Sequence, residues 1–411
     1  MKDNLFHRNF TFLILGQVSS LIGNYTLKFA LSMYVLEQTG SASIFAALLA
    51  VAMVPTVLLS PFGGILADRA NRRNIMVGLD TLSGLTVLAA GLVLPFGRDI
   101  WVIGALLVLL SVLAAFESPT VQACIPQMLS GENLMKGNAA VNQVQAITGL
   151  VTPFLGSMVY AAFGLPPVLW GTMACFFLTA ILECFIQLDY QKEEVTMCVR
   201  EILKKDFLVS IQFLRREQPG ILKLLLLAAL ASLFVAGTVV VGFPYLVRTV
   251  LGLTAEHYGA AESVMGAAAV LGSLFVGIMA QKFRLRWLAF VFMGLGVSLI
   301  PAGMAFLLPV GSFNVYIILL VMFSLGQFGC SLFSTYAISA IQARTPDRLM
   351  GKVMSFVFTL SMCAQPVGQI VYGALFDWFS KTPYWVLIPS GILVCIIGVL
   401  SVEFFEKFET T

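Results

Sequence analysis

Four ionisable side chains stand inside long nonpolar segments of the chain, where charge is expensive. Asp80, Glu117 and Glu183 each lie to one side of the middle of such a segment, by about 7 Å at 1.5 Å per residue. Lys28 lies on the other side of the middle of the first segment. Burying such a charge in lipid costs at least ~2.5 kcal/mol. A carboxyl group in that setting can take up and release a proton, so proton transfer is the chemistry that these residues could do.

Two of the three acids have structural explanations as well. Asp80 follows Arg72 and Arg73 by one or two helical turns, which favours a structural ion pair over a proton site. Glu183 is close to the end of its segment and can simply reach water.

The roles of Glu117 and Lys28 stay open on sequence alone. Glu117 precedes a Ser-Pro pair, whose proline frees backbone carbonyls and loosens the helix, and it is either a proton carrier or a packed structural acid. Lys28 can extend outward to water, pair with an acid or meet an anionic substrate.

Uncharged polar residues also recur in the nonpolar segments. Together with many Phe and Met residues they could line a cavity for a bulky amphipathic molecule, although helix–helix hydrogen bonds would explain part of them. The candidates are Gln17, Asn24, Tyr25, Asn142, Gln143, Gln145, Gln327, Ser331, Tyr336, Gln365 and Gln369.

The amino-acid composition indicates the class of protein to which these residues belong. Of 411 residues, 59% are apolar and 11% are charged, against roughly 25% charged in a soluble protein. The net charge of +3 is too small to define a nucleic-acid-binding surface. Seven scattered Cys and two His indicate no metal site or disulfide scaffold. There is no phosphate-binding loop and no nucleophile–base set, so we expect an integral membrane protein without cofactor or enzymatic activity.

Twelve segments are long and apolar enough to cross the bilayer as helices, which predicts an all-α fold. They are Phe10–Leu36, Ser43–Leu66, Ile75–Phe96, Trp101–Ala123, Asn142–Phe163, Val168–Leu188, Ile221–Val250, Tyr258–Ala280, Leu288–Pro309, Asn314–Ala343, Met354–Phe376 and Tyr384–Phe404. The polar N-terminus has no cleavage site and reads as a retained start, not a signal peptide.

The basic residues orient these spans. With the N-terminus inside, cytoplasmic segments hold 20 of the 24 Lys and Arg residues, three lie outside and Lys28 lies in a span. By the positive-inside rule, both termini are cytoplasmic.

The longest polar stretch divides the chain into six spans and six. We expect residues 1–188 to form an N-terminal bundle, residues 189–220 a cytoplasmic linker and residues 221–411 a C-terminal bundle. Apolar residues recur at roughly helical spacing among the basic residues of the linker, which is typical of an amphipathic helix on the inner leaflet. That helix is either a linker alone or a regulatory element.

The two halves repeat each other in sequence. GILADRANRR from Gly64 aligns with GIMAQKFRLR from Gly277, ENLMKG from Glu132 with DRLMGK from Asp347, and PFLGSMVY from Pro153 with PVGQIVY from Pro366. The offsets agree to within two residues, and six is an even number, so corresponding spans run in the same direction. Such a parallel repeat of six spans places a substrate site at the interface of the halves.

The loop GILADRANRR resembles the signature loop of the major facilitator superfamily, G-x-L-A-D-R-x-G-R-R/K. The resemblance implies a cytoplasmic latch, with Asp68 as its carboxylate, Arg69 and Arg72 as supporters, Gly64 at a close-packing position and Arg73 as a further basic residue. These arginines could instead serve only the positive-inside rule. Asn71 replaces the second glycine, and Asn tolerates positive φ best among other residues. The second copy has Gln281 where Asp68 stands.

Further segments resemble the macrolide-efflux type of drug/proton antiporter within that superfamily. They are LILGQVSSLIGNYTLKFALSMYVLEQTGSAS, IMVGLD, FESPTVQACIPQMLSGENLMKGNAAVNQ and YGAAESVMGAAAVLGSLFVG. The antiporter motif G-P-x-x-G-G survives only as Thr152–Ser157, which departs from the family pattern.

The resemblance implies a proton-coupled exporter of bulky amphipathic compounds, macrolide-like drugs or a native metabolite, in which two six-helix halves rock. We expect a bacterial plasma-membrane protein that acts as a monomer, with protons and a small amphipathic molecule as partners and no nucleic acid. The alternatives are a siderophore exporter or lysolipid flippase on the same fold, or a scaffold or sensor that does not transport. The complete signature loop and the buried acids favour transport.

Overall fold

A computed structural model describes residues 5–97, 99–130, 132–188, 218–279 and 286–410. Long helices joined by short turns make up this part of the chain, and it contains no strand. The linker predicted at 189–220 lies almost wholly outside the described residues, as does Gln281.

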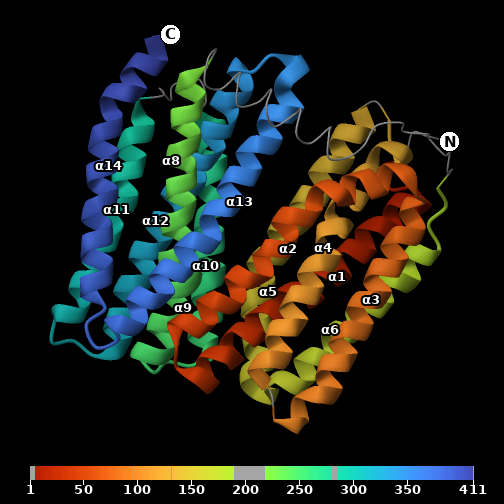
Figure 1. Ribbon diagram of the computed structural model, residues 1–411, viewed down its shortest axis with the longest axis horizontal. Helices are drawn as coiled ribbons and strands as arrows, with labels where there is room; N and C mark the ends of the chain where they lie inside the picture. The colour runs from red at the N-terminus through yellow and green to blue at the C-terminus, as the bar shows by residue number, and fades with distance from the viewer. Residues whose placement is uncertain (1–4, 98, 131, 189–217, 280–285, 411) are drawn as a thin grey trace. The chain divides into compact units, whose positions relative to one another are not determined.

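The first six spans form the helices that the apolar segments predict (Figure 1). They are α1 (Arg8–Thr39), α2 (Ala42–Arg69), α3 (Arg72–Val93), α4 (Asp99–Met128), α5 (Glu132–Phe163) and α6 (Leu165–Cys184), with the short 3₁₀ turn η1 (Leu94–Phe96) after α3. The largest difference is in α5, which begins ten residues before the predicted Asn142, because a helix can continue beyond the hydrocarbon layer where its residues are polar.

The remaining helices also follow the predicted spans. They are α8 (Pro219–Val235), π-helical η3 (Ala236–Gly242), α9 (Phe243–Tyr245), π-helical η4 (Leu246–Val250), α10 (Ala255–Met279), α11 (Trp287–Met304), the 3₁₀ turn η5 (Ala305–Leu307), α12 (Ser312–Arg344), α13 (Asp347–Trp378) and α14 (Tyr384–Thr410). In the described part of the chain, 11 helical segments are long and apolar enough to cross a membrane. The remaining predicted span, Met354–Phe376, lies in α13, a helix of 32 residues. The all-helical prediction is therefore confirmed.

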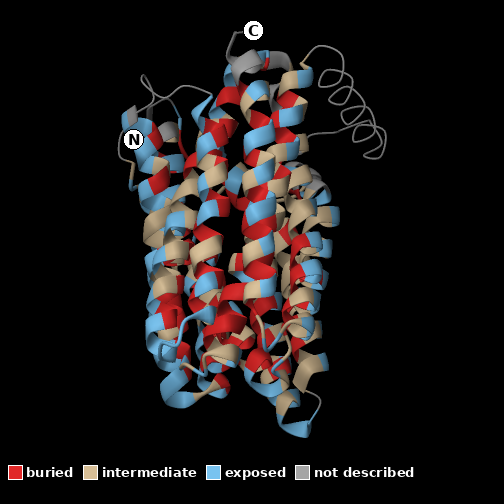
Figure 2. Ribbon diagram, turned by 90° about the vertical axis from the view of Figure 1, so that its left-hand side faces the viewer, coloured by how far each residue is buried: buried red, intermediate tan, exposed pale blue. Residues whose placement is uncertain are grey.

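Many large apolar side chains are exposed along these helices. Figure 2 shows exposed residues recurring between buried ones along each helix. Ile278 is 82% exposed, Leu400 74% and Leu58 62%. Such residues suit contact with lipid chains, which replace water as the solvent of a membrane protein.

The chain divides into two compact units, and one short segment of the N-terminal half belongs to the second unit. Unit 1 contains Met1–Val35 and Val51–Val199, and unit 2 contains Leu36–Ala50 and Arg200–Thr411. Residues 36–50, the end of α1 and the start of α2, thus belong with the C-terminal helices, whereas the sequence places them in the N-terminal bundle.

Both units repeat the same close helix contacts. A Cβ atom on Gly63 of α2 would lie 2.4 Å from the carbonyl oxygen of Ala115 in α4, and one on Gly272 of α10 would lie 2.3 Å from that of Phe328 in α12. Only a residue without a side chain allows backbones to approach so closely. The third and sixth helices of each unit pack together in the same way, as α3 with α6 and α11 with α14.

The seventh span is not a uniform α-helix. It widens into π-helical turns at η3 and η4, on either side of Pro244. Proline has no N–H group and its ring crowds the preceding turn, so the helix must lose or displace hydrogen bonds there. Gly237 and Gly242 face Tyr372 and Phe376 of α13, where a Cβ would come within 2.2 and 2.5 Å of an aromatic carbon.

Candidate functional site

Unit 1 contains a cavity of about 820 Å³ between α1, α4 and α5. Most of its lining side chains are amides, hydroxyls or charged groups, with a few apolar residues. The lining residues are Gln17, Ser20, Leu21, Asn24, Tyr25, Lys28, Ala114, Glu117, Ser118, Val121, Gln122, Ile125, Pro126, Leu134, Asn138, Val141, Asn142 and Gln145. Seven residues of the N-terminal half, including Lys28, were predicted from the sequence to line a substrate cavity. Six of them line this cavity, and Gln143 does not.

Close packing on α6 turns the polar face of α1 towards the cavity. The hydroxyl of Thr179 donates to the carbonyl oxygen of Gly16 at 3.1 Å, and that of Thr172 donates to Gly23 at the same distance. A Cβ on Gly23 would lie 3.0 Å from the Cβ of Cys175. Polar residues that recur every three or four positions on the adjacent face of α1, Gln17, Ser20, Asn24 and Lys28, line the cavity.

The three buried acids lie close together beside the cavity. Ser20 Oγ lies 3.4 Å from Oδ1 of Asp80 and 3.4 Å from Oε1 of Glu117. The carboxyl group of Asp80 also lies near those of Glu117 and Glu183. Glu117 lines the cavity, whereas Asp80 is 0% and Glu183 1% exposed.

Two carboxyl oxygens in this cluster have no hydrogen-bond donor. They are Oδ2 of Asp80 and Oε2 of Glu183, and both are buried. A carboxylate without a donor is costly to bury, and neighbouring carboxylates repel each other. Among the described residues, the cluster therefore brings three carboxyl groups together with the single hydroxyl of Ser20 as a hydrogen-bond donor.

The ion pair predicted for Asp80 is not found in the described part of the chain. Arg72 instead donates to the carbonyl oxygens of Ala67 at 2.8 Å and Ala123 at 2.7 Å. Arg73 donates to the carbonyl oxygen of Cys184. Seven residues of helix, or about 10 Å, separate Arg73 from Asp80, so its guanidinium reaches the end of α6 instead.

The signature loop is held by its arginines and by Asn71. Asn71 has φ −65° and not the positive φ that the sequence suggested, and its side chain caps α3 by accepting from the backbone N–H groups of Arg73 and Asn74. Asparagine is among the best N-cap residues, which explains the replacement of glycine. The side chains of Asp68 and Arg69, and the packing of Gly64, lie outside what the structure describes.

The candidates in the C-terminal half line neither of the two cavities described here. Gln327, Ser331 and Tyr336 are half-buried in α12, and Gln365 and Gln369 lie in α13. All five belong to unit 2.

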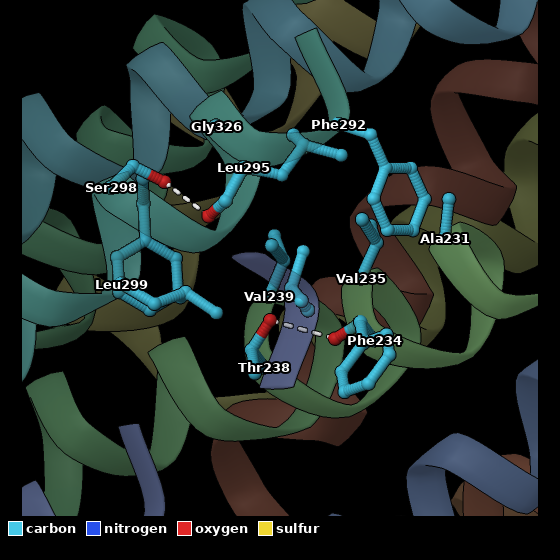
Figure 3. A pocket seen from close by; sticks show the side chains of 12 residues that line it. Ala231, Phe234, Val235, Thr238, Val239, Phe292, Leu295, Ser298, Leu299 and Gly326 are labelled. Atoms are coloured by element: carbon cyan, nitrogen blue, oxygen red, sulfur yellow. Dashed lines mark hydrogen bonds between the residues drawn. The ribbon is translucent and has the colours of Figure 1, made fainter. Parts of the chain in front are cut away.

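A second, much smaller cavity lies in unit 2 beside the π-helical η3 (Figure 3). It measures about 30 Å³, and its walls are mainly apolar side chains such as Phe292 and Val239. The two hydroxyls at its edge are occupied within their own helices, Thr238 with Phe234 at 2.7 Å and Ser298 with Leu295 at 2.9 Å. Because both hydroxyl protons are engaged and the other lining side chains are apolar, this small cavity offers little to hold a water molecule or a polar ligand.

Sequence reasoning missed several residues of the larger cavity. Ser20 was missed although it lies three residues after Gln17 and four before Asn24, on the same helical face. Asn138 was missed because the fifth span was predicted to start at Asn142, although Asn138, Asn142 and Gln145 have the 4-and-3 spacing of one face.

Long membrane-spanning helices in two repeated units, one of which contains a polar cavity, are typical of a secondary membrane transporter. The family model of the Major Facilitator Superfamily matches residues 13–362, and a second match covers residues 225–407. The chain therefore belongs to the Major Facilitator Superfamily, as the signature loop predicted.

Known relatives place it near bacterial efflux proteins. The chain is 25% identical to macrolide efflux protein A of Streptococcus pyogenes over 391 residues, which is 93% of this chain and 92% of that one. It is 24% identical to the multidrug efflux pump Tap of Mycolicibacterium fortuitum, covering 92% and 91% of the two chains. Among solved structures, an inward-facing bacterial homologue of the iron transporter ferroportin matches with a TM-score of 0.71 at 19% identity, over 96% of this chain and 98% of that one. This last likeness concerns the fold alone.

Proposed function

We propose that this transporter is a proton-coupled exporter of bulky amphipathic compounds that works by alternating access. The observation that carries the proposal is the position of Glu117, which lines the cavity and shares the hydroxyl of Ser20 with the buried Asp80. Macrolide efflux and multidrug efflux, the functions for which the bacterial relatives are named, support the direction of transport.

The carboxyl cluster supplies a reason for coupling to protons. A hydroxyl has a single proton, so Ser20 can donate to only one of the two acids at a time. When the cavity is hydrated, Glu117 can ionise and Ser20 can turn towards it. When the cavity closes, the carboxyl of Glu117 loses water and takes up a proton. Alternating access then converts a change in hydration into proton binding and release.

The cavity supports the assignment of the substrate. A volume of about 820 Å³ is within the range of pockets for drug-sized ligands. Amides and hydroxyls provide hydrogen bonds for a molecule with several polar groups, while Leu21, Val121 and Ile125 provide apolar contact. We place the protein in the bacterial plasma membrane, as a monomer with both termini in the cytoplasm.

Transport in everted membrane vesicles tests the proposal. Vesicles that contain the full chain should accumulate a fluorescent amphipathic dye when a proton gradient is imposed. Accumulation should stop when a protonophore dissipates the gradient. Vesicles from cells without the protein are the control. Uptake that is equal with and without the gradient would contradict proton coupling, and no uptake of any amphipathic compound would contradict export.

A further inference from the structure

Two charged side chains line the larger cavity, Lys28 on α1 and Glu117 on α4. Ser20, Asn24 and Lys28 all line the cavity and follow each other at intervals of four residues. Eight residues of α-helix span about 12 Å, so Lys28 is about that distance along the axis from Ser20. Ser20 contacts Glu117. The carboxyl group and the ammonium group therefore meet the cavity about two helical turns apart along α1.

These two charges do not neutralise each other. In the described part of the chain, the ammonium of Lys28 makes no hydrogen bond or ion pair, and the Glu117 carboxyl accepts from the hydroxyl of Ser20. Lys28 lines the cavity, which answers the question that the sequence left open, because the side chain does not have to extend outward to find a polar environment. A lysine among nonpolar helices is costly unless an anion or water accompanies it.

The neighbours of Lys28 cannot take the place of that anion. Asn24 and Tyr25 precede it on the cavity face, and both are uncharged. The buried acids Asp80 and Glu183 are near Glu117, about two helical turns along α1 from Lys28. Lys28 thus offers three hydrogen-bond donors and a full positive charge to whatever occupies the cavity.

We propose that the transported compound is an anionic or zwitterionic amphiphile whose acidic group binds Lys28. The acidic group is a carboxylate, phosphate or sulfate, and hydroxyl or amine groups about 12 Å away face Glu117. The amides of Asn24, Asn142 and Gln145 line the space between and can bind further polar groups. This inference rests on the proposed function, since it assigns a charge to the exported molecule. A purely cationic amphiphile is disfavoured, because it would bring a second positive charge next to Lys28.

A matched pair of fluorescent probes tests the inference. One is a dansyl-labelled long-chain fatty acid, and the other is the dansyl-labelled alkylamine of the same length. The full chain in lipid nanodiscs should bind the acid at least about tenfold more tightly than the amine. Lys28→Gln should weaken binding of the acid by about tenfold without weakening that of the amine, and Lys28→Arg should restore most of it.

The controls separate recognition from folding and from transport. Gln143→Ala changes an amide on α5 that does not line the cavity, and it should leave both affinities unchanged. Equal affinity for the acid in wild type and a folded Lys28→Gln variant would overturn the inference, as would failure of the wild type to bind the acid. If the acid binds as expected but vesicles do not accumulate it under a proton gradient, the binding site for an acidic group at Lys28 stands and the proposed export function fails.

Discussion

The guanidinium of Arg248 lies 2.7 Å from the carboxylate of Glu37, which joins the end of α1 to the seventh span within unit 2. Arg248 also donates to the carbonyl oxygen of Leu253 at 2.7 Å. Both charged side chains are a little over one quarter exposed, at 27% and 29%. An exposed pair of this kind contributes less than about 1 kcal/mol. A second contact must therefore hold segment 36–50 against the C-terminal helices.

That second contact is the cap that Asp377 provides for α2. Its carboxylate accepts from the hydroxyl of Ser41 at 2.6 Å and from the backbone N–H groups of Ala42 at 2.7 Å and Ser43 at 2.9 Å. The unpaired N–H groups at a helix start bind anions well. We expect Asp377→Ala to lower the free energy of unfolding by about 2 kcal/mol.

Thermal denaturation in detergent checks this prediction. Arg248→Gln is the matched comparison and should cost less than about 1 kcal/mol. A cysteine introduced at Ser43 should react with a water-soluble maleimide faster in the Asp377→Ala variant than in the parent protein. If Asp377→Ala melts at the wild-type temperature and the cysteine stays equally protected, the cap does not hold segment 36–50.

The latch assigned to Asp68 gives a prediction about transport rather than stability. Arg72 ties the loop to α2 and α4 through Ala67 and Ala123, so the loop should stay folded without the Asp68 charge. We expect Asp68→Asn to insert into the membrane normally and to weaken the outward-facing state, because one charge-assisted contact is lost. Transport rate per correctly inserted molecule is the measurement. An unchanged rate would remove Asp68 from the mechanism.

The small cavity in unit 2 predicts a gain of stability. Its volume of about 30 Å³ corresponds to roughly 0.7 kcal/mol at about 24 cal/mol per Å³. Val239→Ile adds one methyl group at the cavity wall (Figure 3) and should raise the melting temperature slightly. Val240→Ile, at the next position of η3 and 40% exposed, is the control and should not. A lower melting temperature for Val239→Ile would show that the cavity cannot accept the methyl group.

The fold could be predicted in outline because a bilayer imposes length and hydropathy on each span. The polar first turns of α5 carry no such signal, so the start of this helix was predicted at Asn142 instead of Glu132. The close packing of Gly237 and Gly242 against the aromatic rings of α13 joins positions that are far apart in the sequence. The cap of α2 joins residues that are 335 positions apart, and no local pattern reports such a contact.

The sequence predicts which charged residues belong to the candidate site, but not which residues they contact. A charge inside an apolar run is visible in any sequence, which is why Lys28, Glu117, Asp80 and Glu183 were found. Whether Asp80 meets an arginine or another acid depends on the rotation of α3 about its own axis, and the sequence alone favours the nearer arginines. Ser20 looks like an ordinary helix residue until α1, α3 and α4 are brought together.

The last prediction concerns the carboxyl cluster, where Glu117 is the residue that meets the cavity. Glu117→Gln mimics the protonated acid at almost the same volume, so it should bind substrate yet lose the pH dependence of transport and accumulation against a gradient. Asp80→Asn should stay folded, because its amide can donate to Glu183, whereas Asp80→Ala should be less stable. Vesicle uptake and melting temperature are measured for each variant. Should Glu117→Gln keep full gradient-driven transport while a well-folded Asp80→Asn or Glu183→Gln abolishes it, the coupling proton belongs to the buried pair instead.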